Sequence, residues 1–176
     1  MTSRVVLDAS DIDRALKRIS HEILEANEGS ADLILLGIPT RGVLLADRIG
    51  KILKAIDDSY DPQVGSLDIT LYRDDLAGHH RPVGSTQIPA AGVAGKVVVL
   101  VDDVLYSGRT VRAALDALTE FGRPRQVKLA VLVDRGHREL PIRPDFVGKN
   151  LPTAKTERVG VQLAGVDGID QVVIGE

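Results

Sequence analysis

The chain has 176 residues, no cysteine and a formal net charge of −3 at pH 7. This length predicts one domain over residues 1–176, and the absence of cysteine excludes disulfides, iron–sulfur clusters, thiolate zinc sites and cysteine nucleophiles. With 44% apolar and 27% charged residues, no apolar run near the roughly 18 residues of a membrane span and no signal-peptide core in residues 1–10, we expect a globular cytoplasmic protein without membrane association.

The first third of the chain alternates between helix and strand patterns. A helix is predicted to begin at Ser10, with Asp13 as its capping partner, and to end near Gly29, because its apolar residues follow the 3.6-residue period. Residues 33–36 form a continuous apolar run, as expected for a strand buried on both faces, and residues 43–56 read as a helix.

The rest of the chain continues this alternation. Residues 67–71 alternate between apolar and polar as a strand does, and residues 73–84 are polar and irregular, which indicates a loop. Further on, we predict strands over 97–101, 127–133, 159–163 and 172–174 and a helix over 108–121. Strands that alternate with helices predict a three-layer α/β fold with a mostly parallel sheet. The prolines after Asp134 and the last two strands indicate a small non-helical subregion at one edge.

The strongest functional signal is the run VVLVDDVLYSGRT at residues 98–110. An apolar strand delivers Asp102 and Asp103 to its carboxyl end, and a loop with Ser107, Gly108 and Thr110 then leads into a helix. Amide groups at a helix N-terminus and nearby hydroxyl groups can hold a phosphate, and neighbouring carboxylates can accept hydrogen bonds from ribose hydroxyls. The alternative is a buried strand that ends in an aspartate-rich turn. The glycine motifs of nucleotide triphosphatases and dinucleotide-binding proteins are absent.

This run resembles the signature with which type I phosphoribosyltransferases bind phosphoribosyl diphosphate (PRPP). The resemblance implies that Asp102 and Asp103 hold the ribose hydroxyls and that the loop holds the 5′-phosphate. The residues that it assigns to PRPP or to the nucleotide product are Thr40, Arg41, Asp102, Asp103, Val104, Leu105, Tyr106, Ser107, Gly108, Arg109 and Thr110.

Two further loops fit the same kind of site. Residues 37–42 follow the first buried strand and open a helix, so that their amides, with Thr40 and Arg41, suit a pyrophosphate. Residues 70–76 resemble the closing catalytic loop of the family, in which Arg73 would neutralise charge that develops during the reaction. The alternatives are an ordinary Gly/Pro turn for the first loop and a charged hairpin for the second.

The position of Tyr106 bears on the base. Purine-specific members commonly carry a carboxylate there that serves N7, an atom that pyrimidines lack. The run at 131–150, with the first helix and the loops above, closely resembles the PyrR family of pyrimidine-operon regulators, which are also uracil phosphoribosyltransferases. The resemblance places uracil under a hood formed by Asp134, Arg135, Gly136 and His137. It departs in the short segment 77–81, where we interpret His79 and His80 as loop residues and not as metal ligands.

By this resemblance the protein transfers the phosphoribosyl group of PRPP to N1 of uracil, giving UMP and pyrophosphate. Arg73, Asp102 and Asp103 would be the catalytic residues, and Mg²⁺ would bind through PRPP rather than through protein side chains. The family also binds pyr mRNA, responds to UMP or UTP and forms homodimers or larger assemblies. The alternatives are a uracil salvage enzyme without an RNA role and a regulator with vestigial catalysis.

The charge pattern is compatible with RNA binding in spite of the negative total. Residues 135–158 contain six Lys or Arg and three acidic residues, a local charge of +3. On the first helix, basic residues are expected to face away from the apolar side. The candidate RNA-binding residues are Arg14, Lys17, Arg18, His21, Arg138, Arg143 and Lys149. The alternative is a charged, solvated face. The shortage of aromatic residues disfavours a base-stacking platform for single strands.

Overall fold

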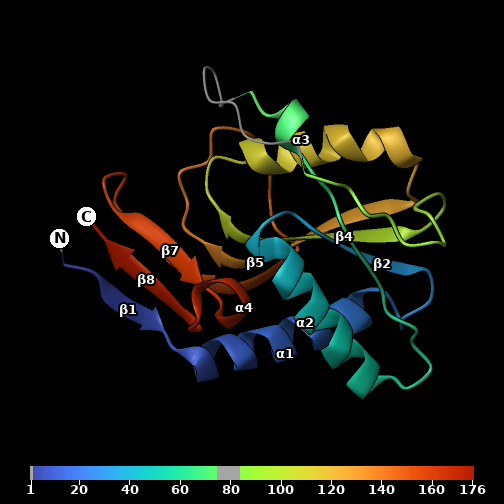
Figure 1. The fold of residues 1–176 in the computed structure, drawn as a ribbon, viewed down its shortest axis with the longest axis horizontal. Helices are drawn as coiled ribbons and strands as arrows, with labels where there is room; N and C mark the ends of the chain where they lie inside the picture. The colour runs from blue at the N-terminus through green and yellow to red at the C-terminus, as the bar shows by residue number, and fades with distance from the viewer. Residues whose placement is uncertain (1, 75–83) are drawn as a thin grey trace.

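The computed structural model describes residues 2–74 and 84–176 and contains the expected three-layer α/β fold (Figure 1). Five parallel strands form the central sheet in the order β3-β2-β4-β5-β6. Their bounds are β2 Leu33–Gly37, β3 Gln63–Ser66, β4 Val97–Leu105, β5 Gln126–Asp134 and β6 Phe146–Asn150. The prediction of a mostly parallel sheet is therefore confirmed, whereas β6 was not predicted.

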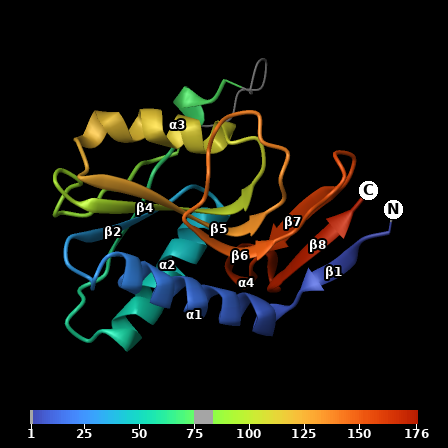
Figure 2. The same ribbon diagram turned by 180° about the vertical axis from the view of Figure 1, so that it is seen from behind.

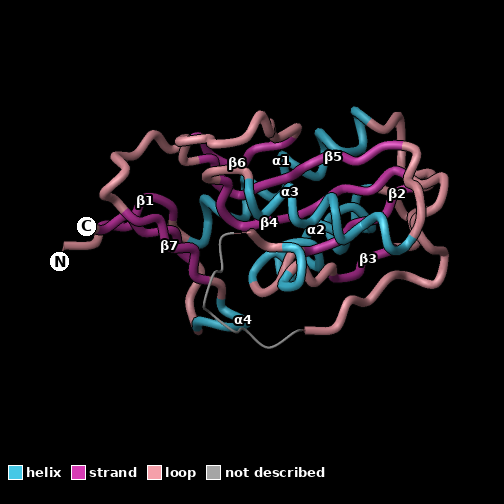
Figure 3. The backbone as a smooth tube through the Cα atoms, turned by 90° about the horizontal axis from the view of Figure 1, so that it is seen from above, coloured by secondary structure: helices cyan, strands magenta, loops and turns pink. Residues whose placement is uncertain are grey.

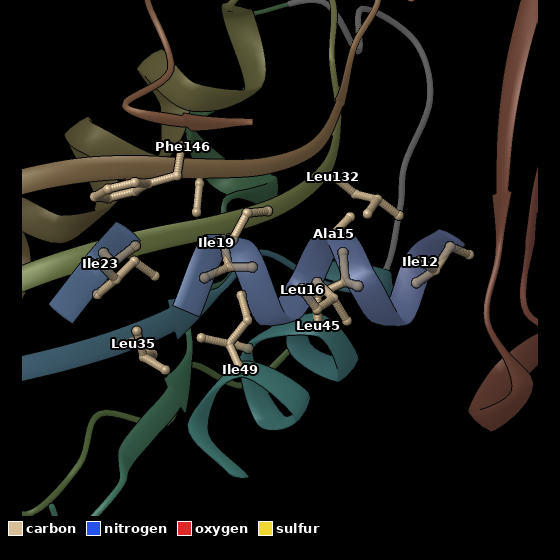
Figure 4. Close-up of a cluster of buried hydrophobic side chains, with 14 of the residues drawn as sticks. Ile12, Ala15, Leu16, Ile19, Ile23, Leu35, Leu45, Ile49, Leu132 and Phe146 are labelled. Atoms are coloured by element: carbon tan, nitrogen blue, oxygen red, sulfur yellow. The ribbon is translucent and has the colours of Figure 1, made fainter. Parts of the chain in front are cut away.

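Helices cover both faces of this sheet. α1 (Ala9–Ala26) and α2 (Arg41–Ile56) pack on one face, and α3 (Arg109–Leu118) packs on the other (Figures 1 and 4). Along β4 the side chains alternate: Val97, Val99 and Val101 belong to the core under α1 and α2, whereas Val98 and Leu100 belong to the core under α3. Since both faces are buried, these central strands are continuously apolar.

The N-cap of the first helix lies two residues earlier than predicted. Asp8, not Ser10, is the N-cap, and its partner is Asp11, not Asp13. Asp8 Oδ1 accepts the Asp11 N–H at 2.9 Å, and Asp11 Oδ2 accepts the Asp8 N–H at 3.0 Å, so two backbone donors at the helix end are satisfied reciprocally.

The predicted strand over 67–71 is wrong. β3 ends at Ser66, and residues 70–72 form a 3₁₀ turn. The cause is Asp68, whose Oδ1 accepts hydrogen bonds from the N–H and the hydroxyl of Thr70 and so bends the chain. Leu71 is consequently 75% exposed. Much of the predicted loop that follows, with His79 and His80, lies outside the described residues.

A second, antiparallel sheet joins the two ends of the chain (Figures 2 and 3). Its order is β1-β8-β7, with β1 Arg4–Leu7, β7 Arg158–Gln162 and β8 Gln171–Gly175. The predicted strands at 159–163 and 172–174 are thus confirmed with small shifts. β1 and the single turn of α4 (Ala164–Asp167) were not predicted, so the subregion is not wholly non-helical. In the parts of the chain that the structure describes, no helix combines the length and the apolar character needed to cross a membrane.

Candidate functional site

The loops at the carboxyl ends of β2, β3 and β4 surround a hollow of about 200 Å³. Its lining includes five residues that the sequence singled out: Arg73, Asp102, Asp103, Val104 and Thr110. The other lining residues are Ile38, Pro39, Asp68, Ile69 and Thr70. A ligand site at this edge is what an open parallel sheet favours, because its loops converge there.

The two adjacent carboxylates occupy different environments. Asp102 is only 7% exposed, and Asp103 is partly exposed beside it. Burial first, and then the charge of Asp103, raise the pKa of Asp102 well above its ordinary value, and the charge of Arg73 opposes this shift. Each carboxylate also accepts one backbone N–H, that of Asp103 at 2.9 Å and that of Val104 at 2.8 Å, which fixes their orientation.

Asp68 is a third carboxylate on this hollow, and the sequence analysis did not single it out. Its Oδ1 is held by Thr70, while its buried Oδ2 has no hydrogen-bond partner among residues 2–74 and 84–176. Its position directly beyond the carboxyl end of β3 is the signal that could have identified it, because Asp102 and Asp103 lie at the corresponding end of β4.

The loop from Tyr106 to Thr110 leads from the end of β4 into the N-terminus of α3, as the sequence predicted. Gly108 has φ 93°, a left-handed conformation that glycine adopts without strain, and α3 begins at the next residue. The first amides of this helix have no partners within it, so they can bind an anion. Ser107 Oγ accepts the Arg109 N–H at 3.3 Å.

Arg109 is engaged by carboxylates on both sides. Its guanidinium contacts Asp74 at 2.8 Å and Glu139 at 3.3 Å, and Arg112 contacts the same Asp74 oxygen at 3.2 Å. These ion pairs connect the start of α3 to the segment after β3 and to the segment after β5.

The loop between β2 and α2 lies tightly against the end of β4. The Ile38 N–H donates to Val101 O at 2.9 Å, and a Cβ on Gly42 would lie 2.4 Å from that same oxygen. The peptide bond between Pro39 and Thr40 is cis. Arg41 donates to Asp167 through Nε at 3.0 Å and through Nη2 at 2.7 Å. Arg41 therefore has a carboxylate partner on α4, Asp167, that the sequence did not reveal.

The predicted hood encloses a separate hollow of about 310 Å³. Its lining contains Asp134 to His137 on one side and residues 150–153 on the other. Two of the predicted residues turn out to hold the hood together. Arg135 is 8% exposed and donates to Thr153 Oγ1 at 3.1 Å and to Glu157 O at 2.8 Å. His137 Nε2 contacts Thr153 O.

Asp134 and Arg138 form an ion pair inside this hood. Arg138 contacts the Asp134 carboxylate at 2.6 Å and also donates to the carbonyls of Tyr106 and Ile142, both at 2.9 Å. Burial alone would raise the pKa of Asp134, but hydrogen bonds from Arg138 and the Gly136 N–H, with the charge of Arg138, lower it below its ordinary value. Arg138, predicted as an RNA contact, is therefore a half-buried structural residue.

The predicted basic face of α1 is largely neutralised by its own acidic neighbours. Arg14 pairs with Asp11, Lys17 with Asp13, and Arg18 with Glu22. Arg18 also donates to the carbonyls of Val147 and Gly148 on β6. These three cations of α1 are exposed, and so are the other candidates Arg143, Lys149 and His21.

A larger hollow of about 380 Å³ lies at the opposite edge of the sheet, near the start of β2 and β4. Two of its charged residues, Asp32 and Lys96, pair with each other at 3.0 Å, and the third, Asp61, accepts a hydrogen bond from Gln63 Nε2 at 3.2 Å. It offers no clustered carboxylates or phosphate loop, so the chemistry favours the carboxyl edge.

The sequence matches the phosphoribosyl transferase domain family over residues 6–164. It is 62% identical to the bifunctional protein PyrR of Streptomyces coelicolor, over 98% of this chain and 90% of that protein. It is 60% identical to the bifunctional protein PyrR of Leifsonia xyli, over 100% of this chain and 98% of that protein. The chain belongs to the PyrR family of phosphoribosyltransferases.

Solved phosphoribosyltransferases share the fold of this PyrR chain at low identity. A hypoxanthine phosphoribosyltransferase of Staphylococcus aureus superposes with a TM-score of 0.69 at 18% identity, covering 96% of this chain and 90% of its own. One of Trypanosoma cruzi superposes with a TM-score of 0.71 at 16% identity, covering 98% and 91%. These likenesses establish the fold. The two PyrR relatives share 60% or more of their aligned residues with the chain over nearly its whole length.

Proposed function

We propose that this PyrR-family chain transfers the phosphoribosyl group of PRPP to uracil, forming UMP and pyrophosphate, and that it regulates pyr gene expression by binding pyr mRNA in response to UMP or UTP. The observation that carries the catalytic part is the meeting of Arg73, Asp102, Asp103 and Thr110 around one hollow at the carboxyl edge of the sheet. The high identity to proteins named bifunctional PyrR supports both parts.

In the proposed reaction the end of β4 and the loop that follows it have separate tasks. Asp102 and Asp103, each fixed by one backbone N–H, accept hydrogen bonds from the two ribose hydroxyls of PRPP. The amides after Gly108, with the hydroxyls of Ser107 and Thr110, bind the 5′-phosphate. With the sugar held at both ends, C1′ is presented to the base, and positioning supplies a large share of the catalysis.

Positive charge on the site serves the leaving pyrophosphate. Thr40 and Arg41, at the start of α2, bind the pyrophosphate, and Arg73 neutralises the negative charge that develops on it. N1 of uracil attacks C1′ and loses its proton to solvent, as the bond from C1′ to the pyrophosphate oxygen breaks through an oxocarbenium-like transition state. No covalent intermediate with the protein is needed.

Mg²⁺ enters this proposal with PRPP as part of the substrate. The carboxylates of Asp68, Asp102 and Asp103 line one hollow and can accept hydrogen bonds from the water ligands of a Mg²⁺ that is bound to PRPP. In the described part of the chain no group of three or more acidic or histidine residues is arranged to hold a metal, so most ligands would come from PRPP and water. The ion would offset charge on the diphosphate.

The base assignment follows from Tyr106 and the hood. Tyr106 stands where a purine-specific site commonly has a carboxylate for N7. Its ring has Arg135 over one face and the His137 ring 6.0 Å away in an edge contact. Both residues belong to the hood segment 134–137 at the carboxyl end of β5. This arrangement supports uracil as the acceptor.

For the regulatory function, we propose that RNA binds an exposed basic surface and not the cations of α1 that are paired with carboxylates. Arg143 and Lys149 are exposed in the region of net positive charge, with His21 on the adjacent helix. We further propose that the protein is cytoplasmic and assembles as a homodimer or larger oligomer.

The direct test incubates the protein with PRPP, Mg²⁺ and either uracil or hypoxanthine. We expect UMP and pyrophosphate from uracil and no product from hypoxanthine. Turnover of hypoxanthine with none of uracil would overturn the base assignment. A gel-shift series with pyr leader RNA, with and without UMP, separates the alternatives: activity without RNA binding indicates a salvage enzyme, and RNA binding without turnover indicates a regulator with vestigial catalysis.

A further inference from the structure

The short helix α4 and the turn that follows it are attached to one face of α2 by two ion pairs. Arg41 binds Asp167, and Arg48 binds Asp170, each through two hydrogen bonds of 2.7–3.0 Å. Between the two pairs, a Cβ on Gly165 would lie 3.2 Å from a methyl group of Leu44. Residues 41, 44 and 48 are three and four positions apart, so they lie on the same side of the helix.

Both aspartates are themselves held by the backbone of α4. Asp167 Oδ2 accepts the Leu163 N–H at 2.7 Å, and Asp170 Oδ1 accepts the Ala164 N–H at 2.7 Å. The arginine hydrogen bonds, and then the backbone hydrogen bonds with Leu163 and Ala164, lower the pKa of both carboxyls against the effect of burial, so both are ionised at neutral pH. The two clamps are therefore alike in construction.

They differ in which edge of the guanidinium is used. Asp170 takes the terminal edge of Arg48, formed by Nη1 and Nη2. Asp167 takes the side edge of Arg41, formed by Nε and Nη2. A guanidinium carries its five N–H donors in one plane, so this side contact leaves the Nη1 donors of Arg41 directed away from Asp167.

The two arginines also differ in their distance from the site. Arg41 is the first residue of α2, directly after the loop against β4, and the charge of Asp103 reaches it. Arg48 is seven residues along, about 10 Å further down the helix axis. Only the Arg41 clamp is therefore placed to act on a ligand at the carboxyl edge.

We propose that Asp167 is a positioning residue: it holds Arg41 by the Nε edge so that Nη1 is presented to the pyrophosphate group of PRPP. An arginine fixed in advance loses less conformational freedom when the anion binds. This inference rests on the proposed function, because it takes pyrophosphate as the ligand of Arg41. It gives the C-terminal subregion a part in binding PRPP.

The test compares Asp167→Asn with Asp170→Asn in the full-length protein. Either change removes one charge and keeps an oxygen for the α4 backbone. We expect Asp167→Asn to weaken magnesium pyrophosphate binding, measured by calorimetry, and to raise KM for PRPP by about five-fold or more, with kcat within about two-fold. Asp170→Asn should leave all three quantities within about two-fold of wild type.

A double-mutant cycle checks that Asp167 acts through Arg41. In an Arg41→Gln background, Asp167→Asn should not weaken pyrophosphate binding further. Additive losses would overturn the inference, and so would unchanged or tighter pyrophosphate binding by Asp167→Asn alone. Equal losses in Asp170→Asn would also overturn it, since they would show a general effect of undocking α4.

If Asp167→Asn does not fold, Asp167→Glu serves in its place, because it keeps the charge but displaces the guanidinium by one methylene. A loss of pyrophosphate affinity of about three-fold or more in that variant supports the inference, and wild-type affinity overturns it. If the wild-type protein neither binds pyrophosphate nor forms UMP, the proposed function fails. An active wild type with an unaffected Asp167→Asn refutes only this inference.

Discussion

The guanidinium of Arg135 lies over the ring of Tyr106, with Cζ 4.3 Å from the ring centroid. The same group donates to Thr153 Oγ1 and to the carbonyls of Ala154 and Glu157. One buried cation thus links the phosphate loop after β4 to the segment that leads from β6 into β7. A cation within about 6 Å of a ring centroid is attracted to the ring face, and more strongly when water is excluded.

Replacing Arg135 with methionine should therefore destabilise the protein. The change keeps an unbranched side chain but leaves the carbonyls of Ala154 and Glu157 without this donor, and we expect the free energy of unfolding to fall by about 2 kcal/mol or more. Urea denaturation measures it. The control is Arg125→Met, whose side chain is 55% exposed and lies 3.5 Å from Asp32; it should change stability by less than about 0.5 kcal/mol. Equal effects in the two variants would contradict this role.

Asp102→Asn should stabilise the ligand-free protein while it removes activity. The folded pKa of Asp102 is raised, first by burial and then by Asp103. When the pKa of a group is higher in the folded protein than in the unfolded chain, the group contributes its full stability at pH values below its unfolded-state pKa. That contribution is lost as the pH rises through its folded-state pKa. At pH 7 the asparagine variant should therefore melt about 2–4 °C higher than wild type, and the difference should shrink as the pH is lowered toward about 4.

Melting curves at several pH values and UMP formation check this expectation. Turnover should fall by about a hundred-fold or more, because a charged acceptor for a ribose hydroxyl is lost. Asp116→Asn on the exposed side of α3 is the control and should change neither quantity. A variant of Asp102 with full activity and a lower melting temperature at pH 7 would contradict the account.

The sequence was sufficient for the features that depend on neighbouring residues. The strands under the core could be predicted because a strand buried on both faces is continuously apolar, as residues 97–101 are. The acidic pair and the phosphate loop follow one another without interruption, so their placement at one strand end needed no tertiary information. The helix cap was harder, because Asp8 and Ser10 are both good capping residues and the local pattern does not choose between them.

What the sequence did not reveal depends on contacts between distant segments. Arg41 and Asp167 are 126 positions apart, and Arg135 and Thr153 are 18 apart. Nothing local distinguishes an arginine held by a partner from one facing solvent. For the same reason the sequence, which assigned Arg135 and Arg138 to ligands, did not reveal that their guanidinium groups also hydrogen-bond within the hood.

Gly42→Ala should be far more damaging than Gly50→Ala on the same helix. A Cβ at residue 42 would lie 2.4 Å from Val101 O, a backbone atom of β4, whereas one at residue 50 would first meet a Val64 methyl group at 2.7 Å. Rotation of Val64 relieves the second contact, and alanine favours the helix by about 1 kcal/mol over glycine. The first contact requires a backbone shift that costs about 1–3 kcal/mol. Thermal unfolding and KM for PRPP should change strongly only in Gly42→Ala; similar behaviour of both variants would contradict the close packing of this loop.

The RNA surface should show itself in the salt dependence of binding. Lys149 lies exposed on the edge strand β6, and Arg143 is exposed in the segment before it. Lys17 is equally basic, but Asp13 lies 2.9 Å from its Nζ and offsets its charge. A cation that binds a phosphate releases condensed counterions, whereas one already paired with a carboxylate contributes less.

Lys149→Gln and Arg143→Gln should each weaken binding to pyr leader RNA and lower the slope of log affinity against log salt by about 0.7–1. Lys17→Gln is the matched control and should change the slope by less than about 0.3. Filter binding over a salt series, in the presence of UMP, gives the slopes, and UMP formation by each variant should equal wild type because these residues lie away from the hollow at Asp102. If Lys17→Gln lowers the slope as much as Lys149→Gln does, the paired face of α1 contacts RNA as well. If neither Lys149 nor Arg143 affects the slope, the RNA surface lies elsewhere on the molecule.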